Sequence, residues 1–439
     1  MIIYILFGVL FLFSIYRNNK RLEMVGTYSG FVFAMLIYYI IIPIILISNI
    51  ESMSLKYSNI YTFIVQKDSQ SYILSLFLTL LCFFIFTMFY NISYKRNFSI
   101  YPINIVREYN QKKAIKIYSF FARLTLIVGG GAFLFLLISM GGITSALKIA
   151  EINRSFAVSL EEFTKYPLLV IPARLITVTP FLYLLLLIEK RKSSYLLFFS
   201  ISFLLAIIFF LFNAGRTHLI AFLLCFAFIY IKKYIRKSWT LIIVLGVVSL
   251  PLLDIMDQVF LFFSTHQLEL TTIDYSAYLY QFIHPFRNIL NLTEMVNIFG
   301  LRNGIDFVTS FIGLLPGLDF SKSYENTSLY FIGENWHILG GIPNDFITFG
   351  FIQFKTIGVI LITSILGFIF GIIDKSLNKL PNGITKNLVS SALVINTFII
   401  VSTADLEPII KGNFILIILS ISIIFTSNQK LKNKGNGII

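Results

Sequence analysis

Residues 189–212 read EKRKSSYLLFFSISFLLAIIFFLF, a basic segment followed by a long apolar one. The triplet Lys190-Arg191-Lys192 precedes the run 195–212, which contains no charged residue. A helix of about 20 apolar residues is long enough to cross the hydrocarbon core of a bilayer, which is about 30 Å thick. Because lipid offers the backbone no hydrogen-bond partners, a single spanning segment of this kind must be helical. The stretch therefore predicts one membrane-spanning helix that begins beside a basic loop.

The same alternation recurs along all 439 residues. Hydrophobic residues make up 57% of the chain and charged residues only 13%, with a mean hydropathy of +0.84, values that exclude a soluble globular protein. We predict an all-α, polytopic integral membrane protein with about eleven transmembrane helices and one large extracytoplasmic loop. The predicted spans are 2–16, 26–48, 72–94, 117–139, 166–188, 195–212, 217–231, 239–256, 355–373, 388–403 and 409–425.

The connections on one side of these spans are consistently basic, which explains the net charge of +14 without a nucleic-acid partner. Basic residues collect in cytoplasmic loops, so this side is predicted to be cytoplasmic, with the N-terminus periplasmic and the C-terminus inside. The expected organisation is 1–256 with eight spans, 257–354 as the periplasmic loop, and 355–439 with three spans and a cytoplasmic tail. The basic residues concerned are Arg17, Lys20, Arg21, Lys95, Arg96, Arg107, Lys112, Lys113, Lys116, Lys190, Arg191, Lys192, Lys232, Lys233, Arg236, Lys237, Lys375, Lys379, Lys386, Lys430, Lys432 and Lys434.

The long outer loop differs from the other connections in charge and in aromatic content. Residues 257–345 contain nine acids and three bases, and their apolar content is too high for a disordered segment. Ile305, Val308 and Ile312 recur at helical spacing and need a partner or a membrane surface to bury against. Aromatic rings such as Tyr324 and Trp336 have flat faces that suit sugar rings, although an interfacial aromatic belt would have the same composition.

No established motif for hydrolysis, phosphate-loop nucleotide binding or zinc is present. The sequence therefore gives no reason to expect a metal or another cofactor. Both cysteines, Cys82 and Cys225, lie inside apolar runs and are interpreted as small core residues. His337, in the outer loop, is a candidate general base near neutral pH, or else an ordinary polar loop residue.

Two arginines stand where positive charge is otherwise depleted. Arg216 follows a glycine at the bend of the hydrophobic hairpin 195–231, and Arg174 lies inside a predicted span. An intramembrane arginine is costly and indicates an anionic partner. Guanidinium groups bind phosphate oxygens in a bidentate manner, so a lipid-linked diphosphate is one candidate. An ion pair with Asp254 or Asp257 is the alternative.

Several local patterns resemble those of the O-antigen and oligosaccharide repeat-unit polymerases, the Wzy family. One is Asn213-Ala-Gly-Arg216-Thr-His at the hairpin bend, and another is the stretch Glu334-Asn-Trp-His337-Ile-Leu-Gly-Gly-Ile-Pro343 that leads into Phe349-Gly-Phe351. Many members have a Glu between the Gly-Gly-x-Pro stretch and Phe-Gly; this chain departs from that pattern, with Asp345 and no Glu between Pro343 and Phe349. Arg302 and Gly313 also fit an Arg-x10-Gly pattern of some members. The number of spans, the basic cytoplasmic loops and the large outer loop extend the resemblance over the whole chain.

The resemblance implies a metal-independent membrane glycosyltransferase in the bacterial inner membrane that polymerises undecaprenyl-diphosphate-linked oligosaccharide repeat units. It implies a chain-length regulator as a partner, besides the substrate and membrane lipids. With this chemistry, the expected roles are His337 or Asp345 as the catalytic base and Tyr324 and Trp336 as sugar contacts. The expected diphosphate ligands are Arg216, Arg174, Arg287 and Arg302.

Two other functions share part of this pattern. An O-antigen ligase would use the same donor and a large outer loop but a different acceptor. A flippase for lipid-linked oligosaccharides would have similar length and composition, but such transporters tend to have short loops on both sides. The loop 257–345 therefore favours a transferase over a flippase.

Overall fold

The structure of the protein is a computed structural model that describes residues 2–22, 25–48, 63–64, 66–95, 111–143, 145–146, 166–212, 219, 222–227, 275–312, 322–334, 341–378 and 384–404. Within these ranges the chain is helical and contains no strand. The predicted all-α membrane class is therefore confirmed. Seven helices of the described part are long and apolar enough to span a membrane.

These seven helices coincide with predicted spans, from Ile2–Asn19 at the N-terminus to Phe346–Asn378. An eighth predicted span, 388–403, corresponds to a shorter apolar helix, Val389–Ser402. The predicted spans 217–231, 239–256 and 409–425 lie mostly or wholly outside the described residues. The total of eleven spans therefore stays a prediction.

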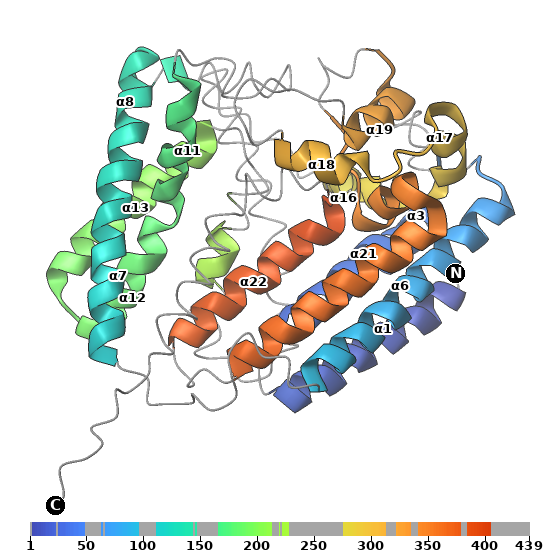
Figure 1. The fold of residues 1–439 in the computed structure, drawn as a ribbon, viewed down its shortest axis with the longest axis horizontal. Coiled ribbons are helices and arrows are strands. Elements are labelled where there is room, and N and C mark those ends of the chain that lie inside the picture. Colours follow the sequence, from blue (N-terminus) through green and yellow to red (C-terminus); the bar gives the residue numbers. More distant parts are fainter. Residues whose placement is uncertain are drawn as a thin grey trace, which may run out of the picture.

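The helices form two groups in space (Figure 1). One group surrounds the largest hydrophobic core, and within it α6 and α21 make the most extensive contact. The members of this first group are α1 (Ile2–Leu22), α2 (Thr27–Leu36), η1 (Ile37–Ile41), α3 (Ile42–Ser48), α6 (Ser69–Lys95), α16 (Tyr275–Leu290), α21 (Phe346–Asn378) and α22 (Ile384–Ser402).

The second group, on the left of Figure 1, has two smaller cores of its own. It consists of α7 (Gln111–Thr125), η2 (Leu126–Gly130), α8 (Gly131–Ser139), η3 (Pro167–Leu169), α11 (Val170–Ala173), η4 (Arg174–Thr177), α12 (Thr179–Lys190) and α13 (Ser193–Phe212). Helix α12 contacts α22, and Leu377 and Val389 from the first group belong to the same core as α12.

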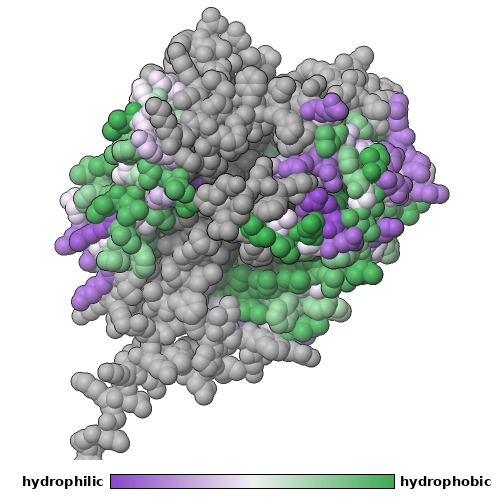
Figure 2. Space-filling view, turned by 45° about the horizontal axis from the view of Figure 1, so that its top comes forward, coloured by the Kyte–Doolittle hydropathy of each residue, from purple (hydrophilic) through white to green (hydrophobic). Residues whose placement is uncertain are grey.

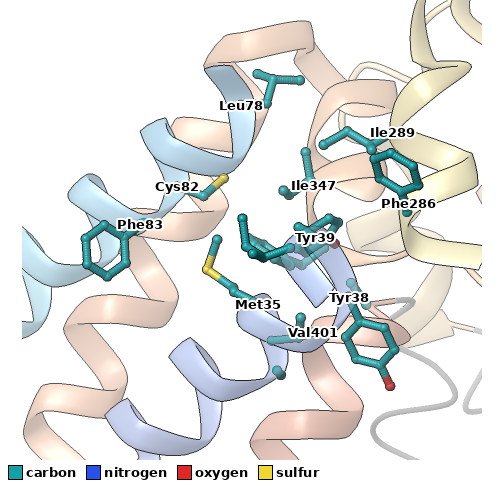
Figure 3. Packing of buried hydrophobic residues seen from close by; sticks show 14 of the residues in the cluster. Met35, Tyr38, Tyr39, Leu78, Cys82, Phe83, Phe286, Ile289, Ile347 and Val401 are labelled. Carbon is teal, nitrogen blue, oxygen red and sulfur yellow. The ribbon is translucent and has the colours of Figure 1, made fainter. Parts of the chain in front are cut away.

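The second predicted span is interrupted by the π-helical turn η1. Pro43 follows this turn and has no N–H to donate to the carbonyl of Tyr39, so the regular α-helical pattern cannot continue there. The wider turn places Tyr38 and Tyr39 side by side, and both are buried. Figure 3 shows Tyr39 among residues of α6, α16 and α21.

Helix α21 is two helices joined by a sharp reversal at Phe354 and Lys355, whose backbone angles are not helical. The short first part packs against the start of the long second part, because the backbone of Gly350 contacts Gly358 and Val359. Eight helical residues cover about 12 Å along the axis, so the short part reaches well below the reversal into the bundle. The predicted start of a span at residue 355 coincides with the beginning of the long part.

At the opposite end of the long part, the buried carboxylate of Asp374 caps the N-terminus of α2. Its oxygens accept hydrogen bonds from Thr27 N (2.8 Å), Tyr28 N (3.2 Å) and the Tyr90 hydroxyl (2.8 Å). Gly26 lies so close to this carboxylate that a Cβ atom there would overlap it. These contacts bring the ends of α2, α6 and α21 together beside the basic connections.

Three short helices and a turn cover the other end of the first group. They are α17 (Leu292–Phe299), α18 (Ile305–Ile312), α19 (Ser323–Ile332) and residues 341–345, which together with α16 we name the cap. In the space-filling view hydrophilic residues gather at this end, above a band of hydrophobic residues (Figure 2). The described part of the predicted loop 257–354 is therefore folded and helical.

Candidate functional site

The base of the cap is a fully buried carboxylate, Asp345, at the N-terminus of α21. One oxygen accepts hydrogen bonds from the Tyr39 hydroxyl (2.7 Å), Ile347 N (3.0 Å) and Thr348 N (3.1 Å), and the other accepts from the Thr348 hydroxyl. This is the geometry of a helix N-cap, in which an Asp side chain satisfies backbone N–H groups of the first turn. Both oxygens of the predicted catalytic carboxylate are thus engaged by donors.

Asn344, the preceding residue, joins the turn 341–345 to α19 and to the end of α22. Its amide contacts the hydroxyl of Thr327 (2.5 Å) and that of Ser323 (2.9 Å) in α19, and its backbone carbonyl accepts from Ala404 N (2.7 Å) after α22. Gly341, at the start of the same turn, lies against the ring of Tyr324. The predicted sugar contact Tyr324 is therefore partly buried beside the turn 341–345.

Helix α16 brings Arg287 to the underside of α19. The side chain is only 7% exposed, and its guanidinium carbon lies 4.1 Å from the centre of the Phe331 ring. The next residue, Asn288, donates to the carbonyl of Pro343 (3.0 Å), which fixes α16 to the turn that carries Asp345. One helical turn earlier, His284 contacts the carbonyl of Ser402 (3.0 Å). The structure thus places Arg287, a predicted diphosphate ligand, close to the Asp345 turn.

Arg302, another predicted diphosphate ligand, forms an ion pair with Asp306 at 2.7 Å. Asp306 also accepts a hydrogen bond from Gln353, and the carbonyl of Gln353's side chain accepts from Gly304 N (3.0 Å). The backbone of Arg302 donates to the carbonyl of Ile352 (3.0 Å). Arg302 therefore fastens α18 to the end of the short part of α21.

An ion pair on the outer surface of the cap joins Lys67 to Glu294. Glu294 also accepts a hydrogen bond from the Tyr330 hydroxyl. The Lys67 hydrogen bond, followed by that of Tyr330, lowers the pKa of Glu294 from its ordinary value of 4.5. The pair ties residues near the start of α6 to α17 and α19, so the cap also rests on the N-terminal third of the chain.

Arg174 belongs to the second helical group. It begins the 3-10 turn η4, which interrupts the predicted span 166–188 and packs against the π turn η2. Gly129 of η2 allows this approach, because a Cβ atom there would be 2.7 Å from Ile176 N. Arg174 is partly buried at this junction of two irregular turns. The predicted residues Arg216, His337 and Trp336 lie outside the described residues.

Several polar residues of this region had no distinguishing signal in the sequence. Tyr39 and Gln353 occur within apolar runs, and Asn288 is one of many amides, so only the fold reveals their contacts. A signal existed for Asp345, because an Asp immediately before an apolar run is typical of a helix N-cap.

The described residues contain no group of three or more His, Cys, Asp or Glu side chains that could hold a metal ion. What this part of the chain does present is a helical membrane bundle with a folded polar cap that contains two arginines and several aromatic rings. Comparisons with protein-family models, with curated proteins and with solved structures find no match to this chain.

Proposed function

We propose that this protein polymerises undecaprenyl-diphosphate-linked oligosaccharide repeat units into O-antigen or a similar surface polysaccharide at the outer face of a bacterial inner membrane. The observation that carries the proposal is the folded cap at one end of an apolar helical bundle. A cap of this kind offers polar and aromatic contacts to a glycan while the bundle accommodates a polyprenyl chain.

The distribution of charge supports the orientation that this reaction needs. The Asp374 contacts with Thr27 and Tyr28 and the Asn378–Tyr94 hydrogen bond (3.2 Å) lie at the end of the bundle that carries Lys95 and Lys375. Basic connections favour the cytoplasm. In the proposed orientation the cap at the opposite end faces the periplasm, where the lipid-linked donor is presented.

The proposed reaction transfers the growing glycan from its lipid carrier to the non-reducing-end hydroxyl of a second lipid-linked repeat unit. The acceptor oxygen forms a bond to the anomeric carbon of the donor, and the bond from that carbon to the lipid diphosphate breaks. His337 takes the proton of the acceptor hydroxyl. The departing diphosphate carries the developing negative charge, so cations directed at it stabilise the transition state, by about 3–4 kcal/mol for one well-placed donor.

The four arginines are proposed to have different roles. Arg216 and Arg174 are proposed to bind the diphosphate together with Arg287, whereas Arg302 positions α18 through Asp306. Tyr324 and Trp336 are proposed to contact sugar rings. Asp345 is proposed as a positioning residue that holds the turn 341–345, because its oxygens are occupied by Tyr39 and by the first turn of α21.

The decisive test uses the full-length protein with a synthetic undecaprenyl-diphosphate repeat unit, in nanodiscs with and without lipid A core as a second acceptor, and in sealed vesicles. Products that contain two or more repeats on one lipid are expected, together with released undecaprenyl diphosphate. Transfer to lipid A core and no multimers would instead identify a ligase. Movement of the intact lipid across a vesicle bilayer without a covalent product would identify a flippase.

Variants in the same assay test the assigned residues. Arg216→Ala and His337→Ala are each expected to abolish multimers at normal protein level. Arg191→Ala, which removes an exposed arginine at the basic end of the bundle, is the matched control and is expected to leave chain length unchanged. Wild-type products from His337→Ala would remove that residue from the mechanism.

A further inference from the structure

Helix α18 of the cap has its polar and apolar faces reversed relative to an ordinary surface helix. Asp306, Thr309 and Ser310 are at most 9% exposed, whereas Ile305 is 51% and Val308 58% exposed. A helix at a water-facing surface places its apolar stripe against the core and its polar face outward. The outward face of α18 is therefore unsuited to water.

The buried carboxylate of α18 has specific ion-pair and hydrogen-bond partners. Asp306 pairs with Arg302 and accepts a hydrogen bond from Gln353 of α21, and Phe307 and Asp306 are thereby both directed toward α21. Phe307, on the same helix, packs edge-on against Phe349 of α21 with ring centres 5.5 Å apart. These contacts fix the rotation of α18, so Ile305 and Val308 cannot turn inward without breaking the ion pair.

Helix α18 begins beside the start of an exposed apolar surface on α21, a helix long and apolar enough to span a membrane. Gly304, immediately before α18, is packed against the ring of Phe354 at the reversal of α21. From there a row of exposed apolar side chains, spaced four residues apart, runs along the membrane-spanning part of α21. Its members are Ile357, Leu361, Ile365 and Ile369, which are 44–66% exposed.

The neighbouring helix α17 shows that this reversal is particular to α18. In α17 the apolar residues Leu292, Met295 and Val296 are buried and the polar residues Thr293 and Asn297 are exposed, beside one exposed apolar residue, Ile298. The polar side chains of α17 thus face outward, whereas those of α18 are buried. The difference indicates two different surroundings, water for α17 and an apolar medium for α18.

We propose that α18 lies in the bilayer surface at the cap end, with Ile305 and Val308 inserted at the boundary between lipid headgroups and acyl chains. An interfacial helix with its apolar face in lipid is a recognised mode of membrane association. Lys355, exposed at the reversal, reaches the headgroup region from the same place. This contact sets the depth of the cap relative to the bilayer, whatever ligand the cap binds.

The test is the accessibility of nitroxide labels in the full-length protein reconstituted in lipid bilayers. Cysteines are introduced singly at Ile305, Val308, Ile357 and Thr293; the native Cys82 and Cys225 are buried. Power saturation is measured with oxygen, which concentrates in lipid, and with a water-soluble nickel chelate. All four positions are exposed, so the labels are not expected to disturb folding, which gel filtration confirms for each variant.

Labels at 305 and 308 are expected to match the lipid-facing label at 357, with high oxygen and low nickel accessibility. The label at 293, on α17, is expected to show the reverse. Higher nickel than oxygen accessibility at 308 would overturn the proposal, because α18 would then face water. Protection of 305 and 308 from both reagents would overturn it as well, because protein rather than lipid would cover this face.

Discussion

At the scale of single residues, the cap is joined to the bundle by buried polar side chains that reach across the sequence. Tyr39 and Asp345 are 306 positions apart and yet share a hydrogen bond of 2.7 Å. Asn288 of α16 donates a hydrogen bond to the turn 341–345, and Asn344 of the same turn accepts one from α19. A buried donor that loses its acceptor costs about 1–3 kcal/mol. These few contacts therefore contribute strongly to the position of the turn 341–345.

The first prediction separates the positioning role of Asp345 from a catalytic one. Asp345→Asn keeps a side-chain acceptor for the first turn of α21, and Asn caps helices about as well as Asp. We expect this variant to unfold near the wild-type temperature and to yield multimers in the nanodisc assay. Asp345→Ala is expected to lower the free energy of unfolding by about 1–3 kcal/mol. If Asp345→Asn folded normally but gave no multimers, the carboxylate would be the base.

The second prediction concerns the pH dependence of the Lys67–Glu294 pair. The pKa of Glu294 is lowered in the folded protein, so its contribution to stability is fully present above the unfolded value of 4.5. It is lost as the pH falls through the folded-state pKa. Because Glu294 is 55% exposed, the contribution is expected to be below about 1 kcal/mol.

The measurement compares wild type with Glu294→Gln by thermal unfolding from neutral pH to well below 4.5. The wild type is expected to be more stable at neutral pH, with a difference that vanishes in acid and shrinks with added salt. A difference that grew on acidification would show that the pair does not stabilise the cap.

At the scale of elements, the irregular turns determine where side chains meet. The π turn η1 places two adjacent tyrosines in the core, and the reversal in α21 returns a short helix against its own continuation. The reversal depends on small residues, since Val359 Cα would be only 2.9 Å from a Cβ atom on Gly350. Glycine at 350 and 358 thus allows two backbones to approach more closely than other residues permit.

The third prediction tests this close approach with a matched pair of glycines. Gly358→Ala would place a Cβ atom on the carbonyl of Gly350, and overpacking of this kind typically costs about 1–3 kcal/mol. Gly131→Ala in α8 meets nothing within 4 Å and is expected to be neutral or stabilising by about 0.5–1 kcal/mol. Thermal unfolding of both variants in detergent is the measurement. Equal behaviour of the two would mean that α21 does not reverse at this point.

At the scale of the whole molecule, charge and hydropathy divide the protein into three zones. The contacts of Asp374 mark the end with basic connections, the exposed apolar faces of the spans mark the middle, and the cap marks the other end. Exposed apolar side chains on α21 and α1 make the outer surface of the middle zone hydrophobic. This division predicts one orientation in the membrane.

The fourth prediction is that Thr293→Cys, exposed in the cap, reacts with a membrane-impermeant maleimide in intact spheroplasts. Ser193→Cys, exposed beside the basic triplet at the start of α13, is expected to react only after permeabilisation. The buried native cysteines give a low background. The opposite pattern would place the cap in the cytoplasm and would contradict the proposed access to a periplasmic donor.

The amino-acid sequence was sufficient to locate the spans of the described part, because a run of about 20 apolar residues has few alternatives to a transmembrane helix. It also placed a span at residue 355 and a helix at the spacing of Ile305, Val308 and Ile312, and both are present. The resemblance to the Wzy family remains the basis of the expected reaction.

Only the tertiary structure decided which polar residues meet and which way each helix faces. The sequence made Asp345 a candidate catalytic base, and only the fold shows that Tyr39 and the first turn of α21 surround its carboxylate. The apolar spacing in α18 did not predict whether this face is buried or exposed, because the rotation of the helix depends on the Arg302–Asp306 pair and on Gln353. A hydrophobic run indicates that a segment lies in lipid rather than in water, because this depends on the segment's own residues. Contacts between distant polar groups depend on how the helices pack.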